Sequence, residues 1–328
     1  MNNTDFTRAI NLANPRLGAA VTYATDDFFA DKARLIDPAD PVFIEGKYDD
    51  NGKWMDGWES RRKRSPGHDF CVLKLGQAGI IHGVDIDTSH FTGNYPPGAM
   101  IEVCNAEEDT PGDSTNWTVL VPKTELEGNS HHLIAVDNGS AWTHLRLHIY
   151  PDGGVARLRV YGTFHKTWEP EDFNHDHDLI AAKNGGRPIF ANDEHFGVLG
   201  NIMAPDRGIN MGDGWETRRR REPGNDWSIV ALGHAGEISK VLVDTTHFKG
   251  NYPSGVMLQA ALVEGDENDL IANSGNWPEL MPRSDLSADS EHVFDSDIKA
   301  LGPVSHVRIN IYPDGGISRL RLLGKPVA

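Results

Sequence analysis

The chain contains two copies of one long segment. Residues 56–100 align with residues 213–257 at a constant separation of 157 positions, and 26 of the 45 aligned positions are identical. The retained residues are mostly Asp, Glu, Arg, His, Asn, Gly and Pro rather than aliphatic residues. A core tolerates exchange among apolar residues of similar volume, so retained charged and amide side chains indicate shared chemistry or shared turns. The duplication therefore predicts two similar domains.

Further matched blocks flank this segment. Residues 146–154 reappear as 308–316 at a separation of 162, and residues 26–29 correspond to 193–196 at a separation of 167. The first copy therefore carries about ten extra residues around 47–54, and loops commonly absorb such length differences. A chain of 328 residues is also long enough for two cores. We expect an N-terminal arm, a first repeat, a linker and a second repeat at 1–24, 25–162, 163–188 and 189–328.

The residue pattern within each copy is that of β-strands. Leu145, Leu147 and Ile149 alternate with polar residues before a turn at 151–154, and apolar residues alternate again after it. Such period-2 alternation around a Gly-rich turn is typical of two strands joined by a tight connection. Helical periodicity is weak, and Pro or Gly interrupts the chain at short intervals. The pattern predicts an all-β protein of two tandem jelly-roll β-sandwich domains.

Charge and composition exclude several classes of partner. The chain carries 31 basic and 48 acidic residues, which gives a formal net charge of −17. Such a field repels phosphate backbones and anionic lipids, so we expect neither nucleic acid nor membrane as a partner. The first residues show no basic flank before an apolar stretch, and no run of about 18 apolar residues occurs, which predicts a cytoplasmic protein. A small anion would need a local cluster of arginines.

The cysteines do not predict a disulfide, and the histidines of the linker do not predict a metal site. Cys71 and Cys104 both belong to the first copy and lie in apolar runs, which favours buried reduced thiols over a disulfide or a nucleophile. His175 and His177 could form part of a metal site, but no third ligand follows at a suitable spacing. We therefore expect no metal and no other cofactor, with a bound divalent ion as the minority alternative.

Two compound motifs occur in both copies. Asp-Gly-Trp-Glu-(Ser/Thr)-Arg-Arg begins at Asp56 and Asp213, and Asp-Thr-(Ser/Thr)-His-Phe-x-Gly-Asn-Tyr-Pro begins at Asp87 and Asp244. In this order and at this length the motifs resemble those of the allantoicase family, over nearly the whole chain except the first two dozen residues and the linker. The resemblance implies two jelly-roll domains of the galactose-binding or discoidin-like type. It also implies hydrolysis of allantoate to ureidoglycolate and urea in purine catabolism.

That reaction breaks a C–N bond at a tetrahedral carbon, so no acylated nucleophile is required. It needs a cation for the substrate carboxylate, hydrogen-bonding partners for the ureido groups, and an acid and a base. Arginine offers the cation in bidentate geometry, and adjacent residues of a strand point to opposite faces, so at most one arginine of each pair should enter the site. The expected substrate-binding residues are Arg61, Arg62, Arg218, Arg219, Asn94, Asn251, Tyr95 and Tyr252.

The acid and the base are expected among the retained histidines and carboxylates. Histidine exchanges a proton near neutral pH. The candidates are His90, His247, Glu59, Glu216, Asp87 and Asp244. Two alternatives stay open, because the histidines could brace loops through a backbone carbonyl and the aspartates could form Asx turns at strand ends.

Other retained residues are expected to have structural roles: Trp58, Trp215, His132 and His292. Arg157 and Arg319, which follow the Gly-rich turns, could reach a site. His68 is replaced by Asn225 in the second copy, so the two halves are not interchangeable.

A non-catalytic tandem module that binds carbohydrate is the competing hypothesis, because jelly-roll domains often bind sugars. The repeated loops are richer in charge than in aromatic residues, which favours chemistry on a small anion. A hydrolase of a related ureido or amidino acid is a third possibility. The sequence leaves open whether a site lies within one repeat, in both, or between them, and we expect a homo-oligomer.

Overall fold

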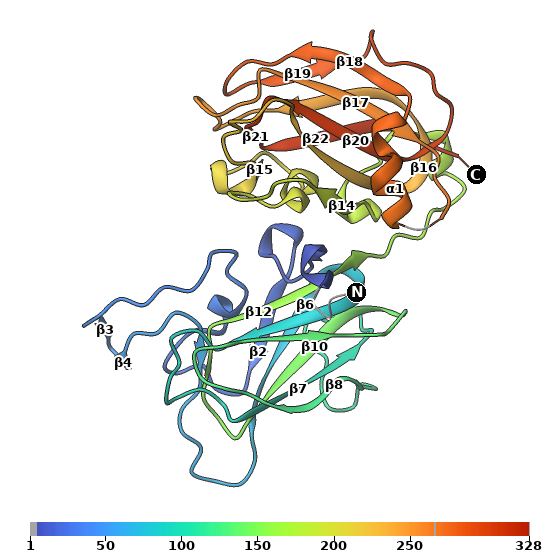
Figure 1. The fold of residues 1–328 in the computed structure, drawn as a ribbon. Coiled ribbons are helices and arrows are strands. Elements are labelled where there is room, and N and C mark those ends of the chain that lie inside the picture. The colour runs from blue at the N-terminus through green and yellow to red at the C-terminus, as the bar shows by residue number, and fades with distance from the viewer. Residues whose placement is uncertain (1–4, 266, 328) are drawn as a thin grey trace. The chain divides into compact units, whose positions relative to one another are not determined.

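The computed structural model describes residues 5–265 and 267–327, and the chain divides into two compact units between His165 and Lys166. We call them domain 1 and domain 2 (Figure 1). In the described residues each domain is built around an eight-stranded antiparallel sheet. The only α-helix described is α1 (Glu267–Asn273). The prediction of an all-β fold in two tandem domains is confirmed.

The two sheets have the same topology. In spatial order the domain 1 strands are β1 (Ile10–Asn11), β12 (Arg157–Phe164), β6 (Asp69–Asp87), β10 (Ala141–Tyr150), β7 (Gly98–Cys104) and β8 (Thr118–Glu125), with β2 (Ala20–Ala24) and β9 (His131–Ala135) also paired to β6. The domain 2 strands are β13 (His177–Asp178), β22 (Arg319–Pro326), β16 (Asp226–Asp244), β20 (Val304–Tyr312), β17 (Gly255–Ala261) and β18 (Glu279–Asp285), with β14 (Arg187–Ala191) and β19 (Glu291–Phe294) paired to β16.

The long strands β6 and β16 join the two layers of each sandwich. The first part of β6 pairs with β2 and β10, and its second part pairs with β9 and β12. β16 is divided in the same way: its first part pairs with β14 and β20, and its second part pairs with β19 and β22. One continuous strand therefore carries the sheet from one layer to the other, and the apolar side chains of both layers face a common core.

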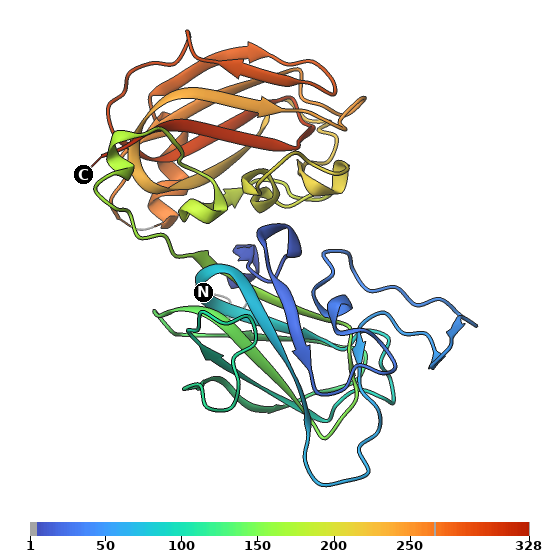
Figure 2. The same cartoon turned by 180° about the vertical axis from the view of Figure 1, so that it is seen from behind.

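Short elements complete each domain. Two-stranded ribbons form from β5 (Trp58–Glu59) with β11 (Gly154–Val155), from β15 (Trp215–Glu216) with β21 (Gly316–Ile317), and from β3 (Tyr48–Asp49) with β4 (Gly52–Lys53). The 3-10 helices are η1 (Asp5–Arg8), η2 (Pro15–Leu17), η3 (Lys32–Ile36), η4 (Asp172–Asn174), η5 (Ala182–Asn184), η6 (Leu199–Met203), η7 (Met211–Asp213) and η8 (Ser274–Asn276). Figure 2 shows the β3–β4 hairpin extending away from the body of domain 1.

The retained glycines after the Pro-Asp turn have a packing reason. Gly153 adopts φ 139°, which side chains rarely tolerate, and a Cβ there would lie 2.7 Å from the backbone nitrogen of Pro96. A Cβ on Gly154 would lie 2.0 Å from the ring of Phe91, which is fully buried. The turn therefore packs directly on the Gly-Asn-Tyr-Pro loop, which explains why both blocks are retained together.

The segments expected to lie outside the two repeats contribute strands to the sheets. The stretch 1–24, expected as an arm, supplies β1 and β2 to the domain 1 sheet. The stretch 163–188, expected as a linker, supplies β13 and the start of β14 to domain 2. These strands lie at the edges of their sheets and most are short. No helix among the described residues is long and apolar enough to cross a membrane.

Candidate functional site

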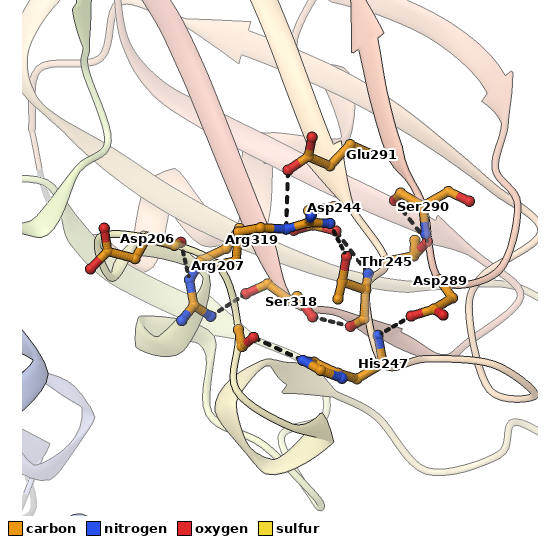
Figure 3. A network of polar contacts seen from close by, with 12 residues as sticks. Asp206, Arg207, Asp244, Thr245, His247, Asp289, Ser290, Glu291, Ser318 and Arg319 are labelled. Carbon is orange, nitrogen blue, oxygen red and sulfur yellow. Dashed lines mark hydrogen bonds and ion pairs between the residues drawn. The ribbon is translucent and has the colours of Figure 1, made fainter.

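Domain 2 has a pocket of about 360 Å³ where β16, β19 and β22 meet a loop. We call it the domain 2 pocket, and we call the loop at residues 204–213 the rim loop of domain 2. Figure 3 shows part of this region. The lining residues are Asp206, Arg207, Leu242, Asp244, Glu291, Arg319 and Arg321. Strand register explains the arrangement, because residues two apart on a strand share a face.

Arg319 holds the rim loop of domain 2 against the sheet through hydrogen bonds. Its side chain is almost fully buried, and its guanidinium donates to the carbonyl oxygens of Asp206 (3.1 Å) and Asp213 (2.5 Å) and to the Asp213 carboxylate (2.7 Å). Burial lowers the pKa of Arg319 to about 10, so the group stays charged at neutral pH. Arg321 donates to the carbonyl oxygens of Ala204 (2.7 Å) and Asp206 (3.0 Å). The two arginines thus satisfy loop carbonyls that would otherwise lack partners.

Arg207 has a different environment, at the rim of the pocket. Its side chain is 61% exposed, and its Nε lies 3.3 Å from Glu291 Oε1 and 3.7 Å from Asp244 Oδ2. A second nitrogen donates to Thr246 Oγ1 at 2.6 Å. The pair with Glu291 is exposed on both sides, and such pairs contribute only about 0–1 kcal/mol, so this guanidinium can exchange Glu291 for another carboxylate at small cost.

Asp244 closes the floor of the domain 2 pocket. Its side chain is nearly inaccessible, and Oδ1 accepts a hydrogen bond of 2.8 Å from the backbone nitrogen of Thr246. This is the Asx turn left open as an alternative by the sequence. The other oxygen, Oδ2, faces Arg207. The turn therefore orients the carboxylate, and one oxygen remains directed toward the pocket.

Domain 1 has the same buried arginine and aspartate at the corresponding positions, but the side chains around them differ. Arg157 and Asp87 occupy the positions of Arg319 and Asp244, as the strand register shows. Arg157 pairs with Asp56 at 2.9 Å and donates to the carbonyl of Ala39 at 2.9 Å, so it fastens residues 37–56, the rim loop of domain 1. Asp87 Oδ1 accepts from the nitrogen of Ser89 at 2.7 Å. The prediction that Arg157 and Arg319 could reach a site is refined, because both act mainly as loop anchors.

Two residues of domain 1 that differ from their domain 2 counterparts form a dyad. Asp85 and His131 replace Leu242 and Glu291, and His131 Nδ1 lies 2.7 Å from Asp85 Oδ2. The hydrogen bond to Asp85 raises the pKa of His131, and burial raises the pKa of Asp85. His131 Nε2 lies 3.9 Å from Asp87 Oδ1. This arrangement of an accessible imidazole on a buried carboxylate is suited to proton transfer.

His90 and His247 brace the rim loops. His90 Nε2 lies 3.1 Å from the carbonyl oxygen of Pro41, and His247 Nε2 lies 2.8 Å from that of Gly208. A carbonyl oxygen only accepts, so Nε2 carries the proton in both rings. Both residues have positive φ, 69° and 74°. The geometry therefore matches the bracing alternative, and a catalytic role for these histidines stays an untested prediction.

Glu59 and Asn94, predicted for different tasks, are joined in the structure. Asn94 donates to Glu59 at 2.7 Å, and Asn251 donates to Glu216 in domain 2. Burial raises the pKa of Glu59. Tyr95 packs on a small apolar cluster made of Met55, Phe91 and Ala156, while Tyr252 is half-buried.

All four paired arginines are exposed. Arg61 Nε lies 2.7 Å from the Asp26 carboxylate, and Arg218 Nε lies 2.7 Å from that of Asp193. Both side chains are mostly exposed, and Arg62 and Arg219 also lie at the surface. The residues predicted from the motifs therefore fall into several separate local groups. Among these residues, Asp244 lines the domain 2 pocket.

The residues expected to have structural roles make structural contacts. His132 donates from Nδ1 to the carbonyl of Ile86 at 2.7 Å and accepts at Nε2 from the nitrogen of Glu127 at 2.8 Å, and His292 has the same pattern. Trp58 and Trp215 are fully buried. Cys71 and Cys104 are free thiols. Within the described ranges no three His, Cys, Asp or Glu side chains are arranged to hold a metal ion.

A second polar network lies in domain 1, on β7 and β10. His68 contacts His148 Nδ1 at 2.8 Å, His148 Nε2 contacts Glu102 at 2.9 Å, and Arg146 donates to the same carboxylate at 2.7 Å. Domain 2 repeats this network with amides in place of the titratable groups: Asn225, Asn310 and Gln259, beside Arg308. Burial lowers the pKa of His148 and of His68.

Several residues that line the domain 2 pocket, or occupy the corresponding region of domain 1, were not predicted. They are Asp85, His131, Arg207, Glu291, Arg321 and Arg159, which donates to the carbonyls of Pro38 and Ala39. The positions beside Asp87 and Arg157 on the same strand face were a usable signal, because period 2 places them together. Identity between the copies was not a usable signal, since Arg207 and Glu291 differ from their counterparts Asp40 and His131.

The family model described as "Allantoicase repeat" matches residues 10–165 and 177–327, which covers both domains. The chain belongs to the allantoicase family. A probable allantoicase of Pseudomonas syringae pv. syringae (strain B728a) is 56% identical over 321 residues, 98% of this chain and 97% of the relative. Probable allantoicase 1 of Burkholderia mallei (strain ATCC 23344) is 55% identical over 325 residues, 98% of this chain and 96% of the relative.

The crystal structure of allantoicase from Saccharomyces cerevisiae has the same fold. It superposes with a TM-score of 0.81 at 35% sequence identity, and the match covers 97% of this chain and 93% of the yeast chain. The tandem arrangement of two β-sandwich domains is therefore shared with a solved member of the allantoicase family.

Proposed function

We propose that this chain is an allantoicase, a hydrolase that cleaves a C–N bond of allantoate to give ureidoglycolate and urea in purine degradation. Membership of the allantoicase family along both repeats supports the activity. We further propose that the domain 2 pocket binds the substrate. The observation that carries this placement is a cavity of about 360 Å³ lined by three arginines and three carboxylates.

Arg207 is the proposed anchor of the substrate carboxylate. It is the most accessible of the three guanidinium groups, and its counterpart in the first repeat is Asp40. An arginine in this position favours an anion, whereas an aspartate would repel it. Its pairs with Glu291 and Asp244 can rearrange when substrate binds. The overall charge of −17 opposes anion binding, so this local cation is needed.

Asp244 and Glu291 are the proposed proton-transfer groups. When the C–N bond breaks, its electron pair leaves with the ureido nitrogen, which takes a proton from a carboxyl group. The lone pair of the remaining ureido nitrogen stabilises the carbon until water adds to it, and the proton of that water passes to the second carboxylate. Asp244 is oriented by Thr246, and Glu291 lies at the rim. Positioned acid and base groups contribute about 10² to 10⁴-fold in rate.

The Asp85–His131 dyad supports a second centre of unequal competence in domain 1. His131 is accessible and Asp85 orients it, as a general acid or base requires. Asp40 lies near this dyad where domain 2 has Arg207, so an anion has weaker anchoring there. We therefore propose that domain 2 carries most of the activity.

Urea release from allantoate by the purified chain tests these proposals. We expect Arg207→Ala to raise KM about 10 to 100-fold, because a hydrogen bond to a charged group contributes about 1.5–3 kcal/mol. Asp244→Asn is expected to lower kcat by 10² or more, within the range of about 10² to 10⁴ for an acid or a base. His131→Ala is expected to remove a minor share. Glycan binding without urea release would instead support a non-catalytic module.

A cytoplasmic location and a homo-oligomeric state are further proposals. The two buried free cysteines support a reducing compartment. The exposed Phe43, Ile44 and Tyr48 near the β3–β4 hairpin support a contact surface for a second copy of the chain. Cell fractionation and light scattering test the two proposals separately.

A further inference from the structure

Domain 2 contains a second, smaller cavity of about 140 Å³. We call it the side cavity. Asp206 and Arg321 line both the side cavity and the domain 2 pocket, so the two spaces adjoin at these side chains. Asp178 and Ala181 line the side cavity away from that boundary. The side cavity has room for several water-sized groups, and thus for the four heavy atoms of a urea group.

Asp178 gives the side cavity its polar character. It lies on β13, and its Oδ1 accepts from the backbone nitrogen of Leu322 at 3.0 Å. Its Oδ2 lies 3.6 Å from Arg321 Nε, which is beyond a normal hydrogen bond. The carboxylate also accepts a backbone hydrogen bond from Ile180, and its remaining lone pairs can accept another donor. Burial raises the pKa of Asp178 to about 6, so at neutral pH the group is mainly a carboxylate, which accepts hydrogen bonds.

We propose that the side cavity binds one ureido arm of the substrate, and hence the urea formed from that arm. This inference rests on the proposed function. A ureido group is planar and presents N–H donors on one edge and a carbonyl oxygen on the other. Asp178 offers the acceptor for the N–H groups of the arm. The carboxylate of the substrate then stays in the domain 2 pocket near Arg207.

The first repeat provides a natural comparison. Asn11 takes the place of Asp178, and its Oδ1 accepts from Val160 at 3.0 Å just as Asp178 accepts from Leu322. Asn14 takes the place of Ala181 at the same separation of 167 residues. An amide therefore replaces the carboxylate and a longer side chain replaces the methyl group. These exchanges assign the ureido subsite to domain 2.

Asp178→Asn and Ala181→Asn install the first-repeat residues and test the subsite. The assay measures inhibition of allantoate turnover by urea and, separately, by acetate as a carboxylate probe. We expect both variants to raise the inhibition constant of urea about 10-fold or more while that of acetate stays within twofold. Asp178→Asn loses a hydrogen bond to a charged group, which is of this size, and Ala181→Asn fills part of the side cavity with a longer side chain. Glu237→Gln, at an exposed position of β16, is the matched control for the loss of one charge.

A second measurement keeps the test independent of turnover. Saturation-transfer NMR of the methyl signal of methylurea reports binding directly in the full chain, and we expect the signal to weaken in both variants. Equal urea inhibition and equal methylurea signals in wild type and variants would overturn the subsite. A wild-type chain that releases no urea from allantoate would refute the proposed function, while the methylurea signal would still decide the subsite. Asp178→Asn is nearly isosteric and carries the test if Ala181→Asn fails to fold.

Discussion

Replacing Arg319 by Met should free the rim loop of domain 2. The guanidinium is 1% exposed and donates to Asp206 and to both the carbonyl and the carboxylate of Asp213. Removing one partner of a buried ion pair costs about 3–5 kcal/mol, because the other charge is left without compensation. We expect a loss of about this size in the free energy of unfolding of domain 2, together with faster hydrogen exchange at residues 204–213.

Arg218→Met is the matched control. Arg218 makes an ion pair of the same 2.7 Å length with Asp193, but its side chain is 66% exposed. Exposed pairs contribute about 0–1 kcal/mol, so this variant should unfold almost as wild type does. Guanidinium chloride unfolding, followed by tryptophan fluorescence, measures both variants without adding urea, a reaction product. Equal losses in the two variants, or a loss below about 1 kcal/mol for Arg319→Met, would contradict the argument from burial.

Three further predictions follow from the same structure. His247→Ala should change kcat less than about fivefold while costing about 0.5–1.5 kcal/mol of stability, since it removes one loop hydrogen bond. A large loss of kcat in steady-state kinetics would instead support a catalytic role for His247. Burial lowers the pKa of His148 in the folded protein. The stability contributed by its neutral form is therefore present above the pKa of the unfolded state and is lost as the pH falls through the pKa of the folded state. Guanidinium chloride midpoints measured between pH 7.5 and 5 should fall in wild type and fall less in His148→Asn. Gly154→Ala places a Cβ 2.0 Å from the Phe91 ring and should cost about 1–3 kcal/mol by thermal unfolding, whereas Gly93→Ala, with nothing within 4 Å, should be nearly neutral.

Much of the fold follows from the repeated sequence, and the domain edges do not. Leu145, Leu147 and Ile149 alternate with polar residues and are buried, as period 2 predicts. The strands β1 and β13 have only two residues each, so they carry no periodicity that a sequence pattern can reveal. Their placement is decided by pairing with β12 and β22, which is a tertiary effect. The expected arm and linker were therefore drawn too wide.

The proposed site was predicted in part for a related reason. Asp244 was recognised because both copies retain it, and it lines the domain 2 pocket. Arg207 and Glu291 were missed because they differ from their counterparts, and a search for identity cannot find divergence. His247 was predicted as an acid or base, but retention of a residue does not distinguish a loop brace from a proton donor. In the structure its Nε2 lies 2.8 Å from the carbonyl oxygen of Gly208, which favours the brace, and the catalytic role stays a prediction.

The buried arginine under each rim loop has a consequence for how these domains can be altered. Arg157 holds the loop at Ala39 and again at Asp56, so the stretch between these two points can change length without disturbing the sheet below. Domain 1 already carries a hairpin there, and doubling a flexible loop costs only about 0.6 kcal/mol in closure entropy. The rim loop is thus a natural grafting position, where foreign peptides could be inserted or the hairpin deleted while both β-sandwiches stay intact.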